Sequence, residues 1–573
     1  MESGEDGPTP STVIKPLNVV VTLFCQPTEG NDMSDAAATI DTHQTGSGRP
    51  KFDSKPNPLG GLVFLLLLLA GLGYVGWSVF KDVSSVGEPL AIAAFGSLGL
   101  ALLIALGFEF VNGFHDTANA VATVIYTHSL PPMVAVVWSG LWNFAGVMVS
   151  TGAVAYSIIT LLPVELILQV GSSAGYAMIF ALLIAAIIWN LGTWALGIPN
   201  SSSHALVGSI MGVGLANQLM APAGQATSGV DWSQATKVLQ ALLFSPFVGF
   251  VGSAVLLLVM KFLIRSKKLY TAPEGDAPPP WWIRGLLILT CTSVSFGHGG
   301  NDGQKGMGLI MLILIGAAPT AYALNRTMPD SSTPAFVATA HKAEAVFAAH
   351  AGPAPALSLP IARTRVGDAL KAGKVDDPSV YGALSVVSAD IEQQVTSYGA
   401  IRKVPAAQTP NLRNDMYLVG DAVRRLTKDG GPKFSADETK TLTGFQKGLQ
   451  SGTRFIPIWV KIAVAIALGL GTMVGWKRIV VTVGERIGKT HLTYAQGASA
   501  ELVAAATIIA AEQFGLPVST THILSSGVAG TMAANGSGLQ WSTVGSIAAA
   551  WVLTLPAAIA LAGGLYFILR HLI

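Results

Sequence analysis

Two short polar stretches inside long apolar runs constrain this chain more than any other feature. The first is 113–119 (GFHDTAN), which lies between an apolar run from Leu90 and another that continues to Tyr126. The second is 297–305 (GHGGNDGQK), again with apolar sequence on both sides. An Asp at membrane depth costs at least about 2.5 kcal/mol, so it normally faces a cavity, a partner or an ion. A chain that accepts this cost twice is expected to use both sites.

Composition places these stretches in a membrane protein. Hydrophobic residues make up 51% of the chain, charged residues 12%, and the mean hydropathy is +0.54. Soluble domains usually carry about 25% charged residues, so a water-soluble fold is excluded. Only two cysteines occur, so neither a disulfide framework nor redox chemistry is expected. The prediction is an all-α polytopic membrane protein.

The apolar runs divide the chain into parts. We expect a disordered tail at 1–57, an extra N-terminal transmembrane helix at 58–80, a first transmembrane repeat at 90–264, the first part of a second repeat at 281–322, an inserted extramembrane domain at 323–455, and the remainder of the second repeat at 456–573. Several runs are short or interrupted by glycine, which is typical of broken helices and re-entrant hairpins in transporters. The insert is expected to be helical, with a capping box from Ser435 to Glu438.

A second matching pair of stretches indicates an internal duplication. Residues 198–204 (IPNSSSH) and 516–522 (LPVSTTH) each precede an apolar, glycine-containing run. About 83 residues separate Asp116 from Pro199, and about 215 separate Asp302 from Pro517. The difference nearly equals the length of the polar insert, so the two halves superimpose once the insert is removed. Secondary transporters with inverted repeats have this architecture.

The hydroxyl-rich stretches suit an oxyanion. A proline followed by three hydroxyl residues at a helix start supplies free backbone N–H groups, hydroxyl donors and the positive end of a helix dipole. A single copy is more readily explained as an ordinary helix cap. Two copies at corresponding positions favour an anion site built from both. The candidate residues are Ser201, Ser202, Ser203, Ser519, Thr520 and Thr521.

The two aspartates imply that an anion would not bind alone. Carboxylates repel an anion in a low dielectric unless cations or protons lie between them. Asn119 and Asn301 add hard oxygen ligands, while His115 and Lys305 supply titratable or positive groups near the same stretches. The alternative is that these polar residues only join helices inside the bundle.

These residues resemble a known family. Residues 110–127, 297–305, 517–522 and 475–489 look like the inorganic phosphate transporter (PiT) family, particularly its bacterial low-affinity Pit branch. The resemblance implies an inverted repeat with two re-entrant hairpins that often dimerises. It also implies which residues act. Phosphate contacts are expected from Asn119, Asn301 and the six hydroxyl residues above, and coupling-ion or proton contacts from Asp116, Asp302, His115, Lys305 and Glu501.

Two departures from the family pattern bear on the coupling ion. His115 replaces the first Asn of the family's usual Gly-x-Asn-Asp, and Lys305 stands where the first copy has Asn119. The loss of oxygen ligands weakens a sodium site and fits proton coupling. In that branch the substrate resembles a neutral complex of hydrogen phosphate with a divalent metal such as magnesium, for which Asp116 and Asp302 would be ligands. For Glu501, a hydrogen bond in helix packing is an equal alternative.

The sequence therefore predicts a secondary transporter and not an enzyme. It would import inorganic phosphate by proton symport across the cell inner membrane as a multi-pass protein, with sodium symport as the alternative. A passive anion channel is the alternative of another class, and an intramembrane phosphohydrolase using His115, Asp116, His298 and Asp302 around a metal is a third. No resident cofactor and no nucleic acid are expected; the expected partners are phosphate, the lipid bilayer and a second copy of the chain.

Overall fold

The computed structural model describes most of the chain after the N-terminal tail. The described residues are 50, 52, 58–86, 92–162, 164–168, 171–222, 229–273, 275–352, 357–428 and 434–572, without the side chains of 92, 93, 117–119, 164 and 165. They belong to one unit, Arg49–Ile573. The predicted disordered tail lies almost wholly outside the described residues, and so does the side chain of Asn119.

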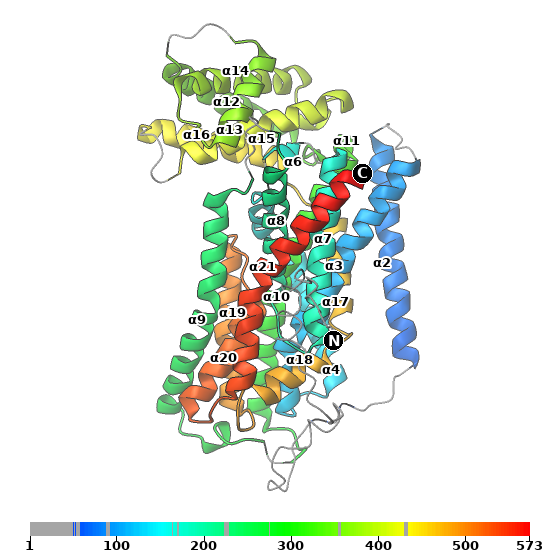
Figure 1. The fold of residues 1–573 in the computed structure, drawn as a ribbon, viewed down its shortest axis with the longest axis vertical. Helices are drawn as coiled ribbons and strands as arrows, with labels where there is room; N and C mark the ends of the chain where they lie inside the picture. The colour runs from blue at the N-terminus through cyan, green and yellow to red at the C-terminus, as the bar shows by residue number, and fades with distance from the viewer. Residues whose placement is uncertain are drawn as a thin grey trace, which may run out of the picture. The chain divides into compact units, whose positions relative to one another are not determined.

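Helices make up the described chain (Figure 1). Before the insert these are α2 (Pro58–Ser85), α3 (Ile92–Tyr126), α4 (Pro132–Val149), α5 (Ala153–Ile159), α6 (Val164–Leu168), α7 (Ser173–Ala195), α8 (Ser202–Leu219), α9 (Trp232–Leu263), α10 (Trp281–Ala317) and α11 (Pro319–Tyr322). The insert contains α12 (Thr333–His350), α13 (Leu359–Ala372), α14 (Pro378–Tyr398), α15 (Thr409–Leu426) and α16 (Ala436–Thr453). After it come α17 (Ile458–Gly471), α18 (Lys477–Val481), a π-helical turn (Thr482–Arg486), α19 (Tyr494–Gln513), α20 (Thr520–Asn535) and α21 (Trp541–Leu572).

Six described helices are long and apolar enough to cross a membrane: α2, α3 from Ala94, α4, α7, α9 and α21. A bent pair, α16 with α17, would make a seventh. The helices α8, α10 and α19 are not among them, because hydroxyl, amide and charged residues lower their hydropathy, and α20, with 16 residues, is too short. The prediction of an all-α polytopic membrane protein is confirmed.

The polar stretches do not break the helices, contrary to the expectation of separate half-helices there. Helix α3 runs without interruption through Asp116, and α10 runs through Asp302. The helix backbone forms its own hydrogen bonds through both stretches, so no break is needed there.

The chain turns back instead just before α8 and α20. Gly197 and Gly515 both have positive φ, at +67° and +64°, which only glycine adopts readily. They allow α7 and α8, and likewise α19 and α20, to form two helical hairpins whose tips carry the hydroxyl residues. The interval between these glycines is about 318 residues, the same as between Pro199 and Pro517.

The hairpins pack against helices from the opposite half of the chain. Helix α8 contacts α21, and α20 contacts α9 (Figure 1). Glycines permit the close approach at both contacts: a Cβ at Gly212 would lie 2.3 Å from the Ile559 carbonyl oxygen, and one at Gly530 would lie 2.1 Å from that of Phe250. These exchanged contacts fit the predicted duplication, although the inverted relation between the halves stays a prediction.

The insert forms its own helical layer. Its helices α12 to α16 enclose a separate hydrophobic cluster and are grouped together in Figure 1. The predicted capping box at Ser435 and Glu438 is confirmed at the start of α16. An ion pair of 2.7 Å between Arg424 of α15 and Asp231, the N-cap of α9, links this layer to the bundle.

The close packing of α10 against α4 can be tested by substitution of Gly299. A Cβ there would lie 2.1 Å from the Asn143 carbonyl oxygen, so Gly299→Ala forces the helices apart. Overpacking of this kind costs about 1–3 kcal/mol, and we expect a lower unfolding temperature in detergent. Gly285→Ala on the same helix is the control, because nothing lies within 4 Å of a Cβ there. Equal unfolding temperatures for the two variants would refute the packing argument.

Candidate functional site

A buried polar cluster lies where α3 and α10 meet the tips of the two hairpins. Its central members are His115 and Asp116 of α3, with His298, Asp302 and Lys305 of α10. None of these five residues is more than 4% exposed. Because a buried charge is unfavourable unless it is paired, the contacts among them decide how the site works.

Asp116 is held from two sides. The Thr521 hydroxyl, at the start of α20, donates a hydrogen bond to its Oδ1. Two imidazoles lie slightly farther away: His115 Nδ1 is 3.7 Å from Oδ1, and His298 Nε2 is 3.8 Å from Oδ2. A carboxylate from the first half of the chain therefore contacts the hairpin of the second half.

Asp302 has a different partner. The Lys305 ammonium lies 2.6 Å from its Oδ2, and His298 Nε2 lies 3.7 Å from the same oxygen. His298 thus faces both aspartates, and its Nδ1 is 2.8 Å from the Asn143 amide oxygen, which orients the ring. The ligand atoms of Asp116, His298 and Asp302 all lie within 4.8 Å of one another, close enough to hold one metal ion.

The hairpin tips are bound to this cluster by further hydrogen bonds. Lys305 donates to the Ser203 hydroxyl, which in turn donates to the Val518 carbonyl oxygen at 2.8 Å. The Asn301 amide donates to the Leu516 carbonyl oxygen at 3.1 Å. Lys305 and Asn301 of α10 therefore fix both tips next to each other.

Each tip begins its helix in the same way. Ser201 and Ser519 are the N-caps, and their hydroxyls accept hydrogen bonds from the His204 and His522 backbone N–H groups. The rings of these two histidines lie 4.5 Å apart between centroids, so the tips of the two halves meet.

On each tip, one buried hydroxyl has no hydrogen-bond partner among the described residues. These hydroxyls are Ser202 Oγ and Thr520 Oγ1. They occupy the same position in the two tips, the first residue of α8 and the first of α20. Buried polar groups are nearly always satisfied, so this matched pair marks a place where a ligand is expected.

Most of the predicted residues come together, and one does not. The clustered residues are His115, Asp116, Ser201, Ser202, Ser203, Asn301, Asp302, Lys305, Ser519, Thr520 and Thr521. Glu501 of α19 accepts a hydrogen bond of 2.5 Å from Thr290, which lies about 18 Å along α10 from Asp302. Its contact fits the helix-packing alternative, and its coupling role stays a prediction.

Sequence reasoning left His298 and Asn143 out of the predicted site. His298 appeared only in the phosphohydrolase alternative, although it lies four residues before Asp302 and therefore on the same helix face. Asn143, on α4, carried no sequence signal, because its contact with His298 depends on how α4 packs against α10.

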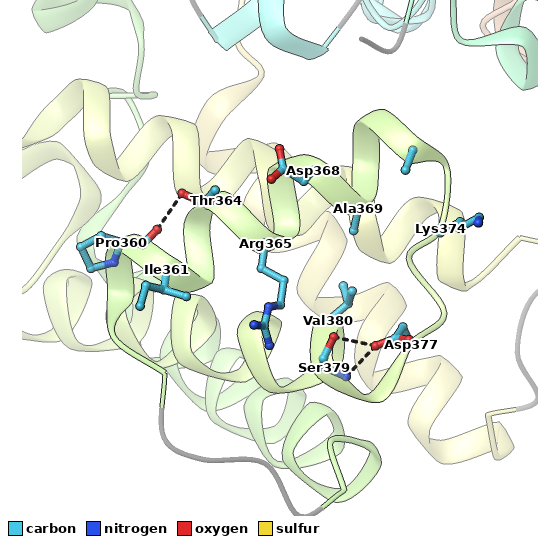
Figure 2. A pocket seen from close by; sticks show the side chains of 11 residues that line it. Pro360, Ile361, Thr364, Arg365, Asp368, Ala369, Lys374, Asp377, Ser379 and Val380 are labelled. Atoms are coloured by element: carbon cyan, nitrogen blue, oxygen red, sulfur yellow. Dashed lines mark hydrogen bonds between the residues drawn. The ribbon is translucent and has the colours of Figure 1, made fainter. Parts of the chain in front are cut away.

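A surface hollow in the insert lies elsewhere and lacks the grouped carboxylates and imidazoles of the polar cluster. It measures about 660 Å³ and is lined by residues of α13 and the start of α14 in the insert (Figure 2). Asp377, one of its carboxylates, is already used as the N-cap of α14, accepting from the Ser379 backbone N–H at 2.8 Å. The polar cluster, by contrast, is closed over by the hairpins.

A closed, charged cluster inside a polytopic helical bundle fits a membrane transporter as the class. Residues 112–562 match the sequence model described as "Phosphate transporter family". The chain therefore belongs to the phosphate transporter family, a family of transporters and not of enzymes.

Individual relatives show to which branch of the family the chain belongs. The chain is 43% identical to "Low-affinity inorganic phosphate transporter PitA" of Escherichia coli (strain K12), over 82% of this chain and 97% of that protein. It is 41% identical to PitB of the same organism, over 83% and 98%. The resemblance to the bacterial low-affinity Pit branch is confirmed. The chain is 20% identical to a solved structure described as "The sodium-dependent phosphate transporter". The match covers 83% of this chain and all of that one, and its TM-score is 0.47.

The bonds from Asn301 to the α20 hairpin tip can be tested directly. Loss of the amide in Asn301→Ala removes the contact with the Leu516 carbonyl, and a hydrogen bond contributes about 0.5–1.5 kcal/mol. We expect backbone hydrogen exchange in 514–522 to become up to about tenfold faster. Asn325→Ala is the matched control, because that amide donates to the Ser451 carbonyl at 2.9 Å in the insert. Unchanged exchange at the tip would show that other contacts hold it.

Proposed function

We propose that this protein imports inorganic phosphate across the cell inner membrane by ion-coupled symport, and that the buried cluster is its binding site. The family and the relatives supply the substrate class. The observation that carries the site assignment is the matched pair of unpartnered hydroxyls, Ser202 and Thr520, at the first turns of α8 and α20.

Two helix starts that face one another suit a tetrahedral anion. Each offers backbone N–H groups and a hydroxyl donor at the positive end of a helix dipole. Phosphate has four oxygens, so it can accept from both tips at once. The Asn301 amide and the Ser203 and Thr521 hydroxyls lie beside these groups and could rearrange towards the anion.

The aspartates make co-transport of positive charge necessary. With Asp116 and Asp302 ionised, a doubly negative phosphate would be repelled, and one Lys305 does not balance the charge. A proton fits best, because His298, a side chain that can carry a proton, lies within 3.8 Å of both carboxylates. Sodium is the weaker alternative, because it prefers oxygen ligands and this cluster contributes nitrogens.

A divalent cation carried with the phosphate is a second form of the same proposal. Asp116, His298 and Asp302 would hold the ion, which is cargo and not a resident cofactor. Carboxylates suit Mg²⁺ or Mn²⁺, whereas the imidazole also admits Zn²⁺. A neutral metal phosphate would cross a low-dielectric site at less cost than a free anion.

Release of the hairpins would open the site. The tips are held to the α3 and α10 helices by Thr521, Ser203 and Asn301, and binding of cargo competes for these same groups. Exchange of these bonds for bonds to cargo, first at one hairpin and then at the other, would give alternating access. Homodimerisation remains a prediction from the resemblance.

Phosphate uptake into proteoliposomes tests the function. Labelled phosphate uptake is measured with a pH gradient or a sodium gradient imposed separately, each with and without Mg²⁺, Mn²⁺ or Zn²⁺. We expect uptake driven by the pH gradient alone and raised by a divalent cation. Sodium dependence would overturn proton coupling, flux indifferent to every gradient would indicate a channel, and no uptake would refute the function.

The two aspartates should be indispensable. In Asp116→Asn or Asp302→Asn the charge that binds the coupling ion is lost, and we expect uptake to fall at least about tenfold, the factor that corresponds to 1.4 kcal/mol. Both variants should still fold and insert, as judged by size-exclusion chromatography. Asp82→Asn is the control, because Asp82 accepts hydrogen bonds from Tyr322 and Trp459 outside the cluster. Wild-type uptake in either cluster variant would remove the coupling argument.

A further inference from the structure

The two halves of the chain place different groups at one equivalent position. The interval of about 186 residues that relates Asp116 to Asp302 also relates Asn119 to Lys305, and the interval of about 318 residues relates Ser203 to Thr521. Each half should therefore contain a carboxylate, a hydroxyl from the opposite hairpin, and a third residue three positions after the carboxylate on the same helix. That third residue is an amide in one half and an amine in the other.

The contacts around the two carboxylates differ accordingly. In one half the Thr521 hydroxyl donates directly to Asp116. In the other, the Lys305 ammonium lies between Asp302, at 2.6 Å, and the Ser203 hydroxyl, to which it donates. The ammonium thus takes a place between a carboxylate oxygen and a hydroxyl oxygen, which are the ligand types that a small monovalent cation prefers.

The surroundings of Lys305 contain a second acidic side chain besides Asp302. Its side chain is wholly buried, and a second carboxylate, Glu109 of α3, packs against the neighbouring Gly306: a Cβ on this glycine would lie 2.5 Å from Glu109 Oε1. Both Glu109 oxygens are buried without a hydrogen-bond partner among the described residues. The ammonium compensates the charge of Asp302, which would be strongly unfavourable if it were buried without a partner.

We propose that Lys305 is a tethered cation that fills one of two equivalent cation positions, leaving only the position beside Asp116 and His298 for a mobile ion. This inference rests on the proposed symport and names the residue that sets its ion requirement. The transporter then moves one cation fewer with each phosphate than a chain with an amide at both positions would. Lys305 also couples the occupied position to the hairpins, since the same ammonium holds Ser203.

Replacing Lys305 by the residue of the other half should create a cation requirement. In Lys305→Asn the ammonium is removed, and the new amide oxygen joins the oxygens of Asp302 and Ser203. We expect Na⁺, compared with choline at equal ionic strength, to raise the unfolding temperature of this variant by about 2 °C per tenfold increase above its Kd. Phosphate uptake by the variant should become dependent on Na⁺. The wild type should show neither response.

Two matched variants test whether the Na⁺ response arises at the position of Lys305. Lys305→Arg keeps a fixed positive charge and should show no response to Na⁺. The double variant Asp302→Asn with Lys305→Asn should lose the response, because the anchoring carboxylate is gone. Where Lys305→Asn is not monodisperse in detergent, Lys305→Gln, which also supplies an amide oxygen, takes its place.

The outcomes separate this inference from the proposed function. A folded Lys305→Asn or Lys305→Gln protein without Na⁺ stabilisation, or a wild type with equal stabilisation, overturns the tethered cation even if phosphate uptake is normal. Absence of uptake by the wild type under every gradient refutes the symport, while the Na⁺ stabilisation still decides whether Lys305 fills a cation position.

Discussion

The burial of two aspartates is the constraint on which the rest of this structure depends. Carboxylates in the interior of a helical bundle require compensation, and here each receives it differently: Asp116 from a hydroxyl and two imidazoles, Asp302 from an ammonium and one of those imidazoles. The groups that compensate them come from both halves of the chain. The groups that hold the hairpins to the central helices therefore include groups that compensate the buried charges, which would suit the symport proposed above.

Packing makes this arrangement possible without broken helices in the centre. Helices α3 and α10 are continuous because their backbone hydrogen bonds run unbroken past the polar residues, and glycines let the surrounding helices approach closely. Each hairpin turns at a glycine, Gly197 or Gly515, just before its hydroxyl-rich helix start. Continuous central helices between two such hairpins would suit the alternating access proposed above.

Sequence reasoning predicted the duplication and located the aspartates and the hydroxyl-rich tips, because each leaves a local pattern: a repeated interval, a polar interruption, and a proline before hydroxyl residues. It placed the helix breaks wrongly, since a polar residue in an apolar run looks the same whether the helix stops or continues. It left His298 out of the predicted site, although this imidazole faces two aspartates from different helices. It also grouped Glu501 with the cluster, whereas Glu501 contacts Thr290, about 18 Å from Asp302 along α10.

The sequence by itself determined the class: composition required a membrane protein, and the paired polar stretches required a shared internal site. Only the tertiary structure decided which groups meet there. Three features depend on residues far apart in the chain: the contact between Lys305 and Ser203, the position of His298 beside two aspartates, and the two hydroxyls without a partner among the described residues. Such contacts are set by the angle and register at which whole helices pack, and no local run of residues encodes them.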